Sequence, residues 1–417
     1  MHTRFIVSLL TLPLALSCAY AQETSSAPTV AISGFGTAAM TMSDTDKAEF
    51  ARPNQASGVG KTARPGVDSN FGVQANIGVN AWLSFTAQGL VRKDAEDDFG
   101  AELAWAFAKA KVSEKLSIRV GRIGLPVFMI SDYRNVGYAN TMLRPPGEMY
   151  AQVAMNSLDG IDATWQENIG DTTISAQLAF GGSRNGIASG TGVLHLDTRG
   201  TTALNLVAEH GPLTVRFGRA DTTLTVNDSS QLNSLLSALR ATGAGYGITQ
   251  LAPLANALSV DKKKASFTAV GLGLDWKNLV VQSEYARRKT DSYVNATDSW
   301  YVMAGYRIDK LLPYYNHAET KSVGHVANTV PAACPAGYPA ACTPTLQALS
   351  AGVNALNAGV TQSTDTIGVR WDFYRSLALK VQIDRVRPSG SAGQLLHAAP
   401  GFTGPVTVGA VALDFVF

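Results

Sequence analysis

Apolar and polar residues alternate along most of this chain, in short runs separated by turn residues. In residues 83–88, for example, Leu83, Phe85 and Ala87 alternate with polar side chains. Because successive side chains of a β-strand point to opposite faces, a period of two predicts strands with one apolar and one polar face. Sixteen such strands are predicted, at residues 29–42, 71–79, 82–92, 102–112, 115–123, 160–167, 172–180, 202–210, 213–220, 266–276, 279–287, 300–308, 311–318, 366–373, 377–386 and 406–417.

The connections between these strands fall into two classes of length. Seven are tight turns, at residues 80–81, 113–114, 168–170, 211–212, 277–278, 309–310 and 375–376, whereas every intervening connection is longer. Short turns on one side and long loops on the other are typical of outer-membrane β-barrels. An even number of antiparallel strands, with both chain ends free to pair, also allows the sheet to close. The pattern therefore predicts an all-β protein, a transmembrane antiparallel β-barrel of sixteen strands.

Charged positions predict which face of each strand points inward, because Arg or Lys on the lipid face near the midplane costs about 2–4 kcal/mol. Ile367 is therefore assigned to the lipid face and Arg370 to the lumen. Residues 102–112 are ambiguous, since two aromatic residues share the parity of Lys109 and Lys111, and the same argument assigns both lysines to the lumen. An interfacial aromatic girdle is expected near the tight turns, where four residues lie: Trp82, Trp165, Trp276 and Tyr374.

One long segment, residues 124–157, has no period and yet carries little charge. It is rich in aromatic residues and methionine, contains the rigid pair Pro145-Pro146, and has the acidic and basic side chains Asp132, Arg134, Arg144 and Glu148. A loop this long and apolar is expected to pack against other parts of the protein, because its aromatic surface would otherwise be exposed to water. We therefore predict that this third long loop is folded inside the barrel.

The same region carries a resemblance to a known family. Residues 103–165 resemble the third-loop region of proteobacterial outer-membrane porins, of the general-porin kind, in the motifs Arg119-x-Gly-Arg122, Pro126-x-Phe128, Ser131-Asp-Tyr133, Val136-Gly-Tyr138 and Arg144-Pro-Pro-x-Glu148-x-Tyr150. The resemblance implies a homotrimeric barrel in the outer membrane of a Gram-negative bacterium, surrounded by lipid and lipopolysaccharide. It further implies a water-filled channel for passive diffusion of small hydrophilic solutes and ions, whose lumen the third loop narrows.

Both ends of the chain carry features of export. Arg4, the apolar run after it and a small-x-small site form the pattern of a cleaved signal peptide over residues 1–21, so that residues 22–417 are expected to form the barrel. A lipoprotein signal at Cys18 is the alternative, although the leucine usual three positions before a lipidated cysteine is absent. The last residues alternate and end on Phe417, which resembles the signature that the outer-membrane assembly machinery recognises.

Composition narrows the remaining possibilities. The formal net charge is only +2, so no nucleic-acid partner is implied. Cys334 and Cys342 are predicted to form a disulfide, since an exported chain meets an oxidising compartment and no His or carboxylate between them completes a metal site. Two free thiols are the alternative. Helical periodicity predicts short helices at 231–240 and 346–356, and Lys262-Lys-Lys264 is either a solvated charge run or a basic collar at the pore mouth.

No enzyme, metal or cofactor motif is found, and for a pore the charges along the lumen set the selectivity. The predicted inward basic residues are Arg92, Lys109, Lys111, Arg119, Arg216, Arg307, Arg370 and Lys380. The predicted inward acidic residues are Asp162, Glu209, Glu284, Asp372, Asp384 and Asp414. In the third loop, the charges of Asp132, Arg134, Arg144 and Glu148 balance. Since the basic residues outnumber the acidic ones, the channel is predicted to be weakly anion-favouring or non-selective.

Three alternatives stay open. Arg119 and Arg216 are also explained as structural ties to loop carboxylates such as Asp132 and Glu148. The barrel is alternatively a substrate-selective channel. The last alternative is an outer-membrane hydrolase, with a Ser and a His such as His317 brought together across strands, or an adhesin.

Overall fold

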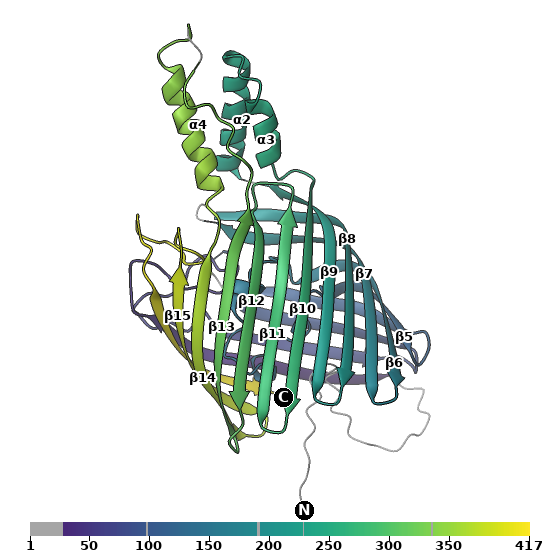
Figure 1. Ribbon diagram of the computed structural model, residues 1–417. Helices are drawn as coiled ribbons and strands as arrows, with labels where there is room; N and C mark the ends of the chain where they lie inside the picture. Colours follow the sequence, from purple (N-terminus) through teal and green to yellow (C-terminus); the bar gives the residue numbers. More distant parts are fainter. Residues whose placement is uncertain (1–27, 97–98, 190–191, 228, 335–336) are drawn as a thin grey trace, which may run out of the picture.

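The computed structural model describes residues 28–417 except 97–98, 190–191, 228 and 335–336. The predicted signal peptide, with Arg4 and Cys18, lies outside the described residues. Sixteen antiparallel strands form one closed barrel, in which each strand pairs with its neighbours in the sequence and β1 pairs with β16 (Figure 1). The prediction of a sixteen-stranded antiparallel barrel is confirmed.

The strands are β1 (Thr29–Ser43), β2 (Asn70–Gly78), β3 (Leu83–Lys93), β4 (Phe99–Lys111), β5 (Leu116–Gly124), β6 (Ser157–Ile169), β7 (Thr172–Ser189), β8 (Gly192–His210), β9 (Leu213–Asn227), β10 (Lys263–Trp276), β11 (Leu279–Thr290), β12 (Ala296–Tyr306), β13 (Leu311–Gly324), β14 (Gln362–Tyr374), β15 (Leu377–Pro388) and β16 (Val406–Val416).

The barrel closes where the two ends of the described chain meet. Gly34 and Phe417 exchange two backbone hydrogen bonds, of 2.9 and 3.0 Å, and the ladder between β1 and β16 continues as far as Ser43 opposite Val408. A side chain at Gly34 would collide with the Phe417 ring, since a Cβ there would lie 2.3 Å from its Cζ atom. Each strand thus pairs with a neighbour on both sides, and the sheet closes on itself.

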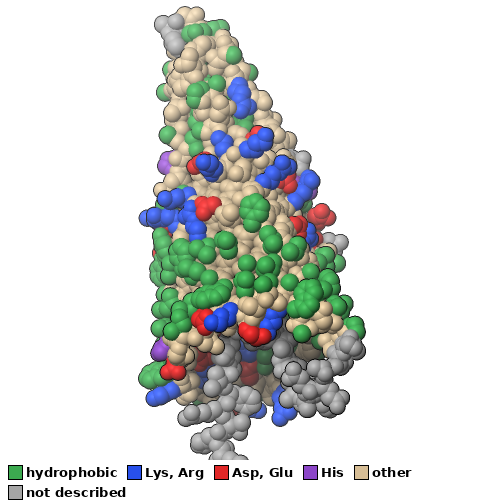
Figure 2. Space-filling view, turned by 90° about the vertical axis from the view of Figure 1, so that its right-hand side faces the viewer, with side chains coloured by type: hydrophobic (Ala, Val, Ile, Leu, Met, Phe, Trp, Pro, Cys, Tyr) green, Lys and Arg blue, Asp and Glu red, His purple; other side chains and the backbone are tan. Residues whose placement is uncertain are grey.

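The outer surface of the barrel is apolar. Every strand carries at least one exposed large apolar or aromatic residue, and Figure 2 shows, on one face, apolar side chains in a band between two rows of charged side chains. Phe85 and Ile367, which the parity argument assigned to lipid, are 44% and 59% exposed, whereas Gln88 and Lys380 on the opposite, inner face are buried. The aromatic residues near the tight turns are exposed as well: Trp82, Trp165, Trp276 and Tyr374.

The strand bounds differ from the prediction mainly in one hairpin. β7 and β8 continue well beyond the predicted ends at Phe180 and Thr202, and Ser183–Ser189 pairs with Gly192–Thr198 after a bulge. The sequence there is rich in glycine and polar residues and does not alternate. Backbone hydrogen bonding between adjacent strands can extend a hairpin without an apolar face, so side-chain pattern alone misses this part.

Three helices project from the long-loop end of the barrel (Figure 1). α2 (Ser230–Gly245) and α4 (Cys342–Leu356) confirm the two predicted helices, and α3 (Leu251–Leu258) was not predicted, although its leucines are spaced for one helical face. The helices share an apolar core that includes Leu239, and the predicted Cys334–Cys342 disulfide is present. No helix among the described residues has the length and apolar character needed to cross a membrane.

The segment between β5 and β6 contains a short 3₁₀ turn, η1 (Gly137–Ala139), and one turn of helix, α1 (Gly147–Tyr150). Most of its large apolar residues are buried. Phe128 and Met149 are almost fully buried and belong to one apolar cluster with Phe267 of β10 and Tyr301 of β12. The segment is thus packed against strands far from β5 and β6 around the barrel.

Candidate functional site

The segment between β5 and β6, called here the third loop (residues 125–156), contacts β10, β11 and β12. The backbone N–H of Met129 donates to Glu284 Oε2 at 2.8 Å, and the Phe128 ring lies 5.0 Å from the Phe267 ring. The Tyr150 hydroxyl donates to Glu284, which also accepts from the Tyr301 hydroxyl at 3.0 Å. These contacts combine apolar packing with a fully hydrogen-bonded buried carboxyl group.

A second set of contacts joins the third loop to β15 and β16. Lys380 Nζ donates to the carbonyl oxygens of Gly137, Asn140 and Met142, at 2.7, 2.6 and 3.1 Å. The same ammonium lies 2.9 Å from Asp414 Oδ2, and both side chains are fully buried. A buried ammonium is tolerated only when its donors are satisfied, so Lys380 requires this part of the loop to be in place.

Arg144 ties the centre of the loop to two buried carboxylates. Its guanidinium donates two hydrogen bonds to Asp68, at 2.7 and 2.9 Å, and a third to Asp384 of β15 at 2.5 Å. Burial by itself would raise the pKa of Asp68, but the charges of Arg144 and Arg52 and a hydrogen bond from Thr41 hold it below its usual value. Asp68, in the connection between β1 and β2, was not predicted as a site residue.

Glu148 is held by neutral partners rather than by a cation. Gln362 Nε2 donates to its Oε1 at 2.7 Å, and the Thr364 hydroxyl donates to the same atom. Burial raises the pKa of Glu148, and the two hydrogen bonds oppose this only in part. With Lys380 and Arg144, Glu148 completes a row of attachments between the loop and β14–β16.

Arg119 and Arg216 lie on strands of the barrel wall and bind other residues of the wall. Arg119 makes hydrogen bonds of 2.5–3.1 Å to the buried Asp162 on the adjacent strand, and Arg216 donates to Asn205 at 2.5 Å. Neither is paired with Asp132 or Glu148, so the idea that these arginines tie those loop carboxylates is wrong. Their partners lie next to them in the sheet, where the strand register places them.

Four other predicted inward residues differ in their relation to the loop. Arg370 reaches it, donating to the carbonyls of Tyr138 and Asn140 at 2.7 and 3.0 Å as well as to Asp372. By contrast, three basic residues lie toward the tight-turn end: Lys109, Lys111 and Arg307. Lys109 is opposite Arg119 in the ladder, Lys111 pairs with Glu114 at 2.8 Å, and Arg307 pairs with Asp275 at 2.5 Å.

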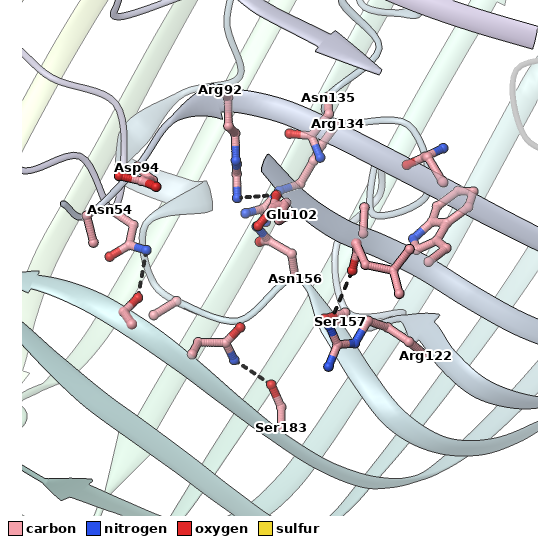
Figure 3. A pocket seen from close by; sticks show the side chains of 18 of the residues that line it. Asn54, Arg92, Asp94, Glu102, Arg122, Arg134, Asn135, Asn156, Ser157 and Ser183 are labelled. Atoms are coloured by element: carbon pink, nitrogen blue, oxygen red, sulfur yellow. Dashed lines mark hydrogen bonds and ion pairs between the residues drawn. The ribbon is translucent and has the colours of Figure 1, made fainter. Parts of the chain in front are cut away.

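A cavity of about 330 Å³ lies between the third loop, β3–β4 and the extended hairpin β7–β8 (Figure 3). Arg92 pairs with Glu102 at 3.0 Å inside it, and Arg122 pairs with Asp159 at 2.7 Å at its edge. Figure 3 shows the ends of Arg92, Glu102 and Arg134 gathered beside Asn156. The exposed Asp132 also lines this cavity.

Arg134 is the exception among the charged residues of the third loop, because it has no hydrogen-bond or ion-pair partner among the described residues. Burial, together with the nearby charges of Arg92 and Arg52, lowers its pKa to about 9. Arg52 belongs to the connection between β1 and β2, and burial, with the nearby charges of Arg92 and Arg144, lowers its pKa although Asp68 opposes this. Neither Arg52 nor Glu102 was predicted as a site residue, because Arg52 lies in a loop without a period and Glu102 is the first residue of the strand predicted at 102–112.

His317, one half of the hydrolase alternative, lies on the outer face. Its Nδ1 atom is 2.7 Å from Asp365 Oδ1, and the same carboxylate also contacts Tyr315 and Arg387. Among the described residues, no serine hydroxyl is hydrogen-bonded to this histidine. Nothing in this arrangement resembles a nucleophile activated by a base.

The fold is similar to those of known outer-membrane proteins. With the anion-selective porin from Comamonas acidovorans the TM-score is 0.53 at 10% sequence identity, over 94% of this chain and 100% of that chain. With Salmonella typhi OmpF in complex with daunomycin it is 0.53 at 12%, over 93% and 97%. With OmpT of Vibrio cholerae, expressed in the outer membrane, it is 0.51 at 13%, over 94% and 99%. No protein-family model and no curated protein sequence matches the chain. The likeness is one of fold.

Proposed function

We propose that this protein is an outer-membrane porin, a water-filled channel through which small hydrophilic solutes and ions diffuse passively. The observation that carries the proposal is the closed barrel with an apolar outer belt and an inner face lined by charged and polar side chains. A belt of this kind on every strand would be costly in water and suits the hydrocarbon core of a bilayer. We place the barrel in the outer membrane of a Gram-negative bacterium, in contact with lipid and lipopolysaccharide.

The third loop is proposed to lie inside the lumen and to narrow it. It leaves the wall between β5 and β6, and its partners Glu284, Lys380 and Asp384 belong to β11 and β15, on the inner face. Contacts with residues on the inner face of several distant strands support a path of the loop through the interior of the barrel. Arg144, Glu148 and the carbonyls bound by Lys380 are then the attachments that set the size of the opening.

The selectivity is proposed to be weakly anion-favouring. Most charges near the loop are neutralised in pairs, such as Arg119 with Asp162 and Lys380 with Asp414. The guanidinium of Arg134, which has no partner among the described residues, and the nearby Arg52 are the basic groups that we expect to act on passing ions, opposed by the acidic groups Asp132, Asp94 and Glu96 of the same cavity. Charges in a narrow, partly low-dielectric opening act strongly, because the field is focused and screening is incomplete.

The experiment is the conductance of the purified protein in planar bilayers under a gradient of potassium chloride. We expect discrete channel steps and a small reversal potential of the sign that indicates chloride preference. A folded, heat-resistant barrel that produces no steps would contradict the channel function, and a strong cation preference would contradict the assignment of the charges. Cross-linking in the native membrane tests the homotrimer, and the expected result is a band at three times the mass of the monomer.

A further inference from the structure

The cavity of Figure 3 is lined by both acidic and basic side chains, but one of its guanidinium groups, that of Arg134, makes no hydrogen bond or ion pair with a described residue. Arg92 pairs with Glu102, and Arg122 pairs with Asp159, whereas Arg134 has no partner among the described residues. The nearby Arg92 and Arg52 repel the charge of Arg134, and an anion bound directly to its guanidinium relieves this repulsion. The arrangement is therefore complementary to a negatively charged ligand.

We propose that Arg134 and Arg92 bind the carboxylate of a small, hydroxylated organic acid as it passes through the channel. A guanidinium carries five N–H donors in one plane, which suits the two oxygens of a carboxylate. Arg92 contacts Glu102 through its Nη2 atom, so its remaining donors stay available. This inference rests on the proposed channel function and adds to it the class of solute that the channel retains.

The rest of the cavity indicates the remainder of the ligand. Its volume of about 330 Å³ is at the small end of the range for small-molecule sites. The neutral residues that line it include several whose amide or hydroxyl groups can exchange hydrogen bonds with the hydroxyl groups of a ligand: Asn54, Asn135, Asn156, Ser183 and Asn185. The buried Oδ1 atom of Asn156 has no hydrogen-bond partner, so this amide can turn toward a bound donor without losing a bond there. A hydroxyl-rich chain fits these walls better than an apolar one.

The acidic residues of the same cavity limit the charge of the ligand. Asp132 is exposed there, and Asp94 and Glu96 also line the cavity. A second carboxylate on the ligand would approach these groups, and repulsion between like charges would oppose it. The geometry therefore favours a monocarboxylate over a di- or tricarboxylate.

The test uses D-gluconate as the probe and D-glucose as a control of similar size without the carboxylate. In planar bilayers at constant ionic strength, gluconate should reduce the chloride current of the unmodified protein with a half-blocking concentration in the millimolar range, and glucose should not. Arg134→Gln should raise that concentration at least about tenfold, and Arg134→Lys by less, because Lys keeps the charge but loses the planar pair of donors. Arg122→Gln removes an equal charge at the edge of the cavity and should resemble the unmodified protein.

Binding of gluconate to the detergent-solubilised protein, measured by calorimetry, separates the two proposals. If the unmodified protein releases or absorbs heat on binding gluconate and Arg134→Gln abolishes that heat, the site is supported even if no channel steps are seen. Channel steps that gluconate does not affect would overturn the site but not the proposed channel function. Equal shifts for Arg134→Gln and Arg122→Gln would also overturn it, since they would indicate a general effect of charge.

Discussion

Three of the long insertions between strands are held in place in two different ways. The third loop is attached to the barrel by buried charged and polar contacts, such as Arg144 with Asp68 and Asp384, in addition to apolar packing around Phe128. Helices α2, α3 and α4 instead share an apolar core around Leu239, and Arg240 is their only charged side chain. A loop that lies against a polar wall needs specific partners, whereas helices that project beyond the barrel need a core of their own. A substitution that loosens the third loop should therefore leave the helices folded, and a substitution that unfolds the helices should leave the third loop in place.

The largest effect is expected from Arg144→Met. The substitution leaves Asp68 and Asp384 buried without their cation, and breaking a buried pair in this way costs about 3–5 kcal/mol. This free-energy cost should loosen the third loop and leave the backbone pairing of the strands intact. Single-channel recordings should show a larger and noisier conductance, with barrel assembly retained.

The matched control for that experiment is Arg219→Met. Arg219 pairs with Asp221 on the exposed outer face, where an ion pair contributes little. Its conductance should equal that of the unmodified protein. A conductance that Arg144→Met leaves unchanged would show that this tie does not hold the loop in place.

Next in size is Leu239→Ala in the helices. Leu239 is fully buried, and a Leu-to-Ala change in a core costs about 2–5 kcal/mol. The helices should become sensitive to protease while the conductance stays the same. The exposed Gln347→Ala on α4 is the control. A change in conductance with Leu239→Ala would show that the helices are coupled to the pore and are not independent of the third loop.

Loss of the disulfide should have a smaller and similarly local effect. Replacing Cys334 and Cys342 by Ser removes a cross-link between residues eight positions apart, worth roughly 2–3 kcal/mol by chain entropy. Protease resistance of the helices should fall, with the barrel intact. In the unmodified protein without residues 1–21, thiol titration after denaturation under non-reducing conditions should detect no free thiol, and two thiols would refute the pairing.

The smallest effect concerns pH. The pKa of Asp68 lies below its usual value, so the stability from its pair with Arg144 is present above the unfolded pKa of about 3.9 and is lost only as pH falls through the lower folded pKa. Glu148 has a raised pKa, so its contribution is greatest at low pH and declines as pH rises. Acidification from pH 7 to 4.5 should therefore leave the conductance unchanged. A step increase within that range would show that the loop is released by protonation of another group.

Strand number and sidedness could be predicted because they depend on neighbours in the sequence. Phe85 and Ile367 point outward as their alternation with polar residues requires. The Gly-rich part of β7 and β8 could not be predicted, since its pairing comes from the adjacent strand and not from its own pattern. α3 was missed because one helical face of only eight residues is a weak signal, and its stability comes from packing on α2.

The sequence by itself determined which face of each strand is apolar and which is polar. A period of two separates a face for lipid from a face for water, and this needs no knowledge of distant residues. Only the tertiary structure decided which charges are neutralised. Arg144 meets Asp384 across 240 positions of the chain, whereas Arg134 in the same loop meets no partner among the described residues. Electrostatic energy falls with distance in space, and barrel closure sets those distances, so residue type alone could not distinguish a structural tie from a charge open to solutes.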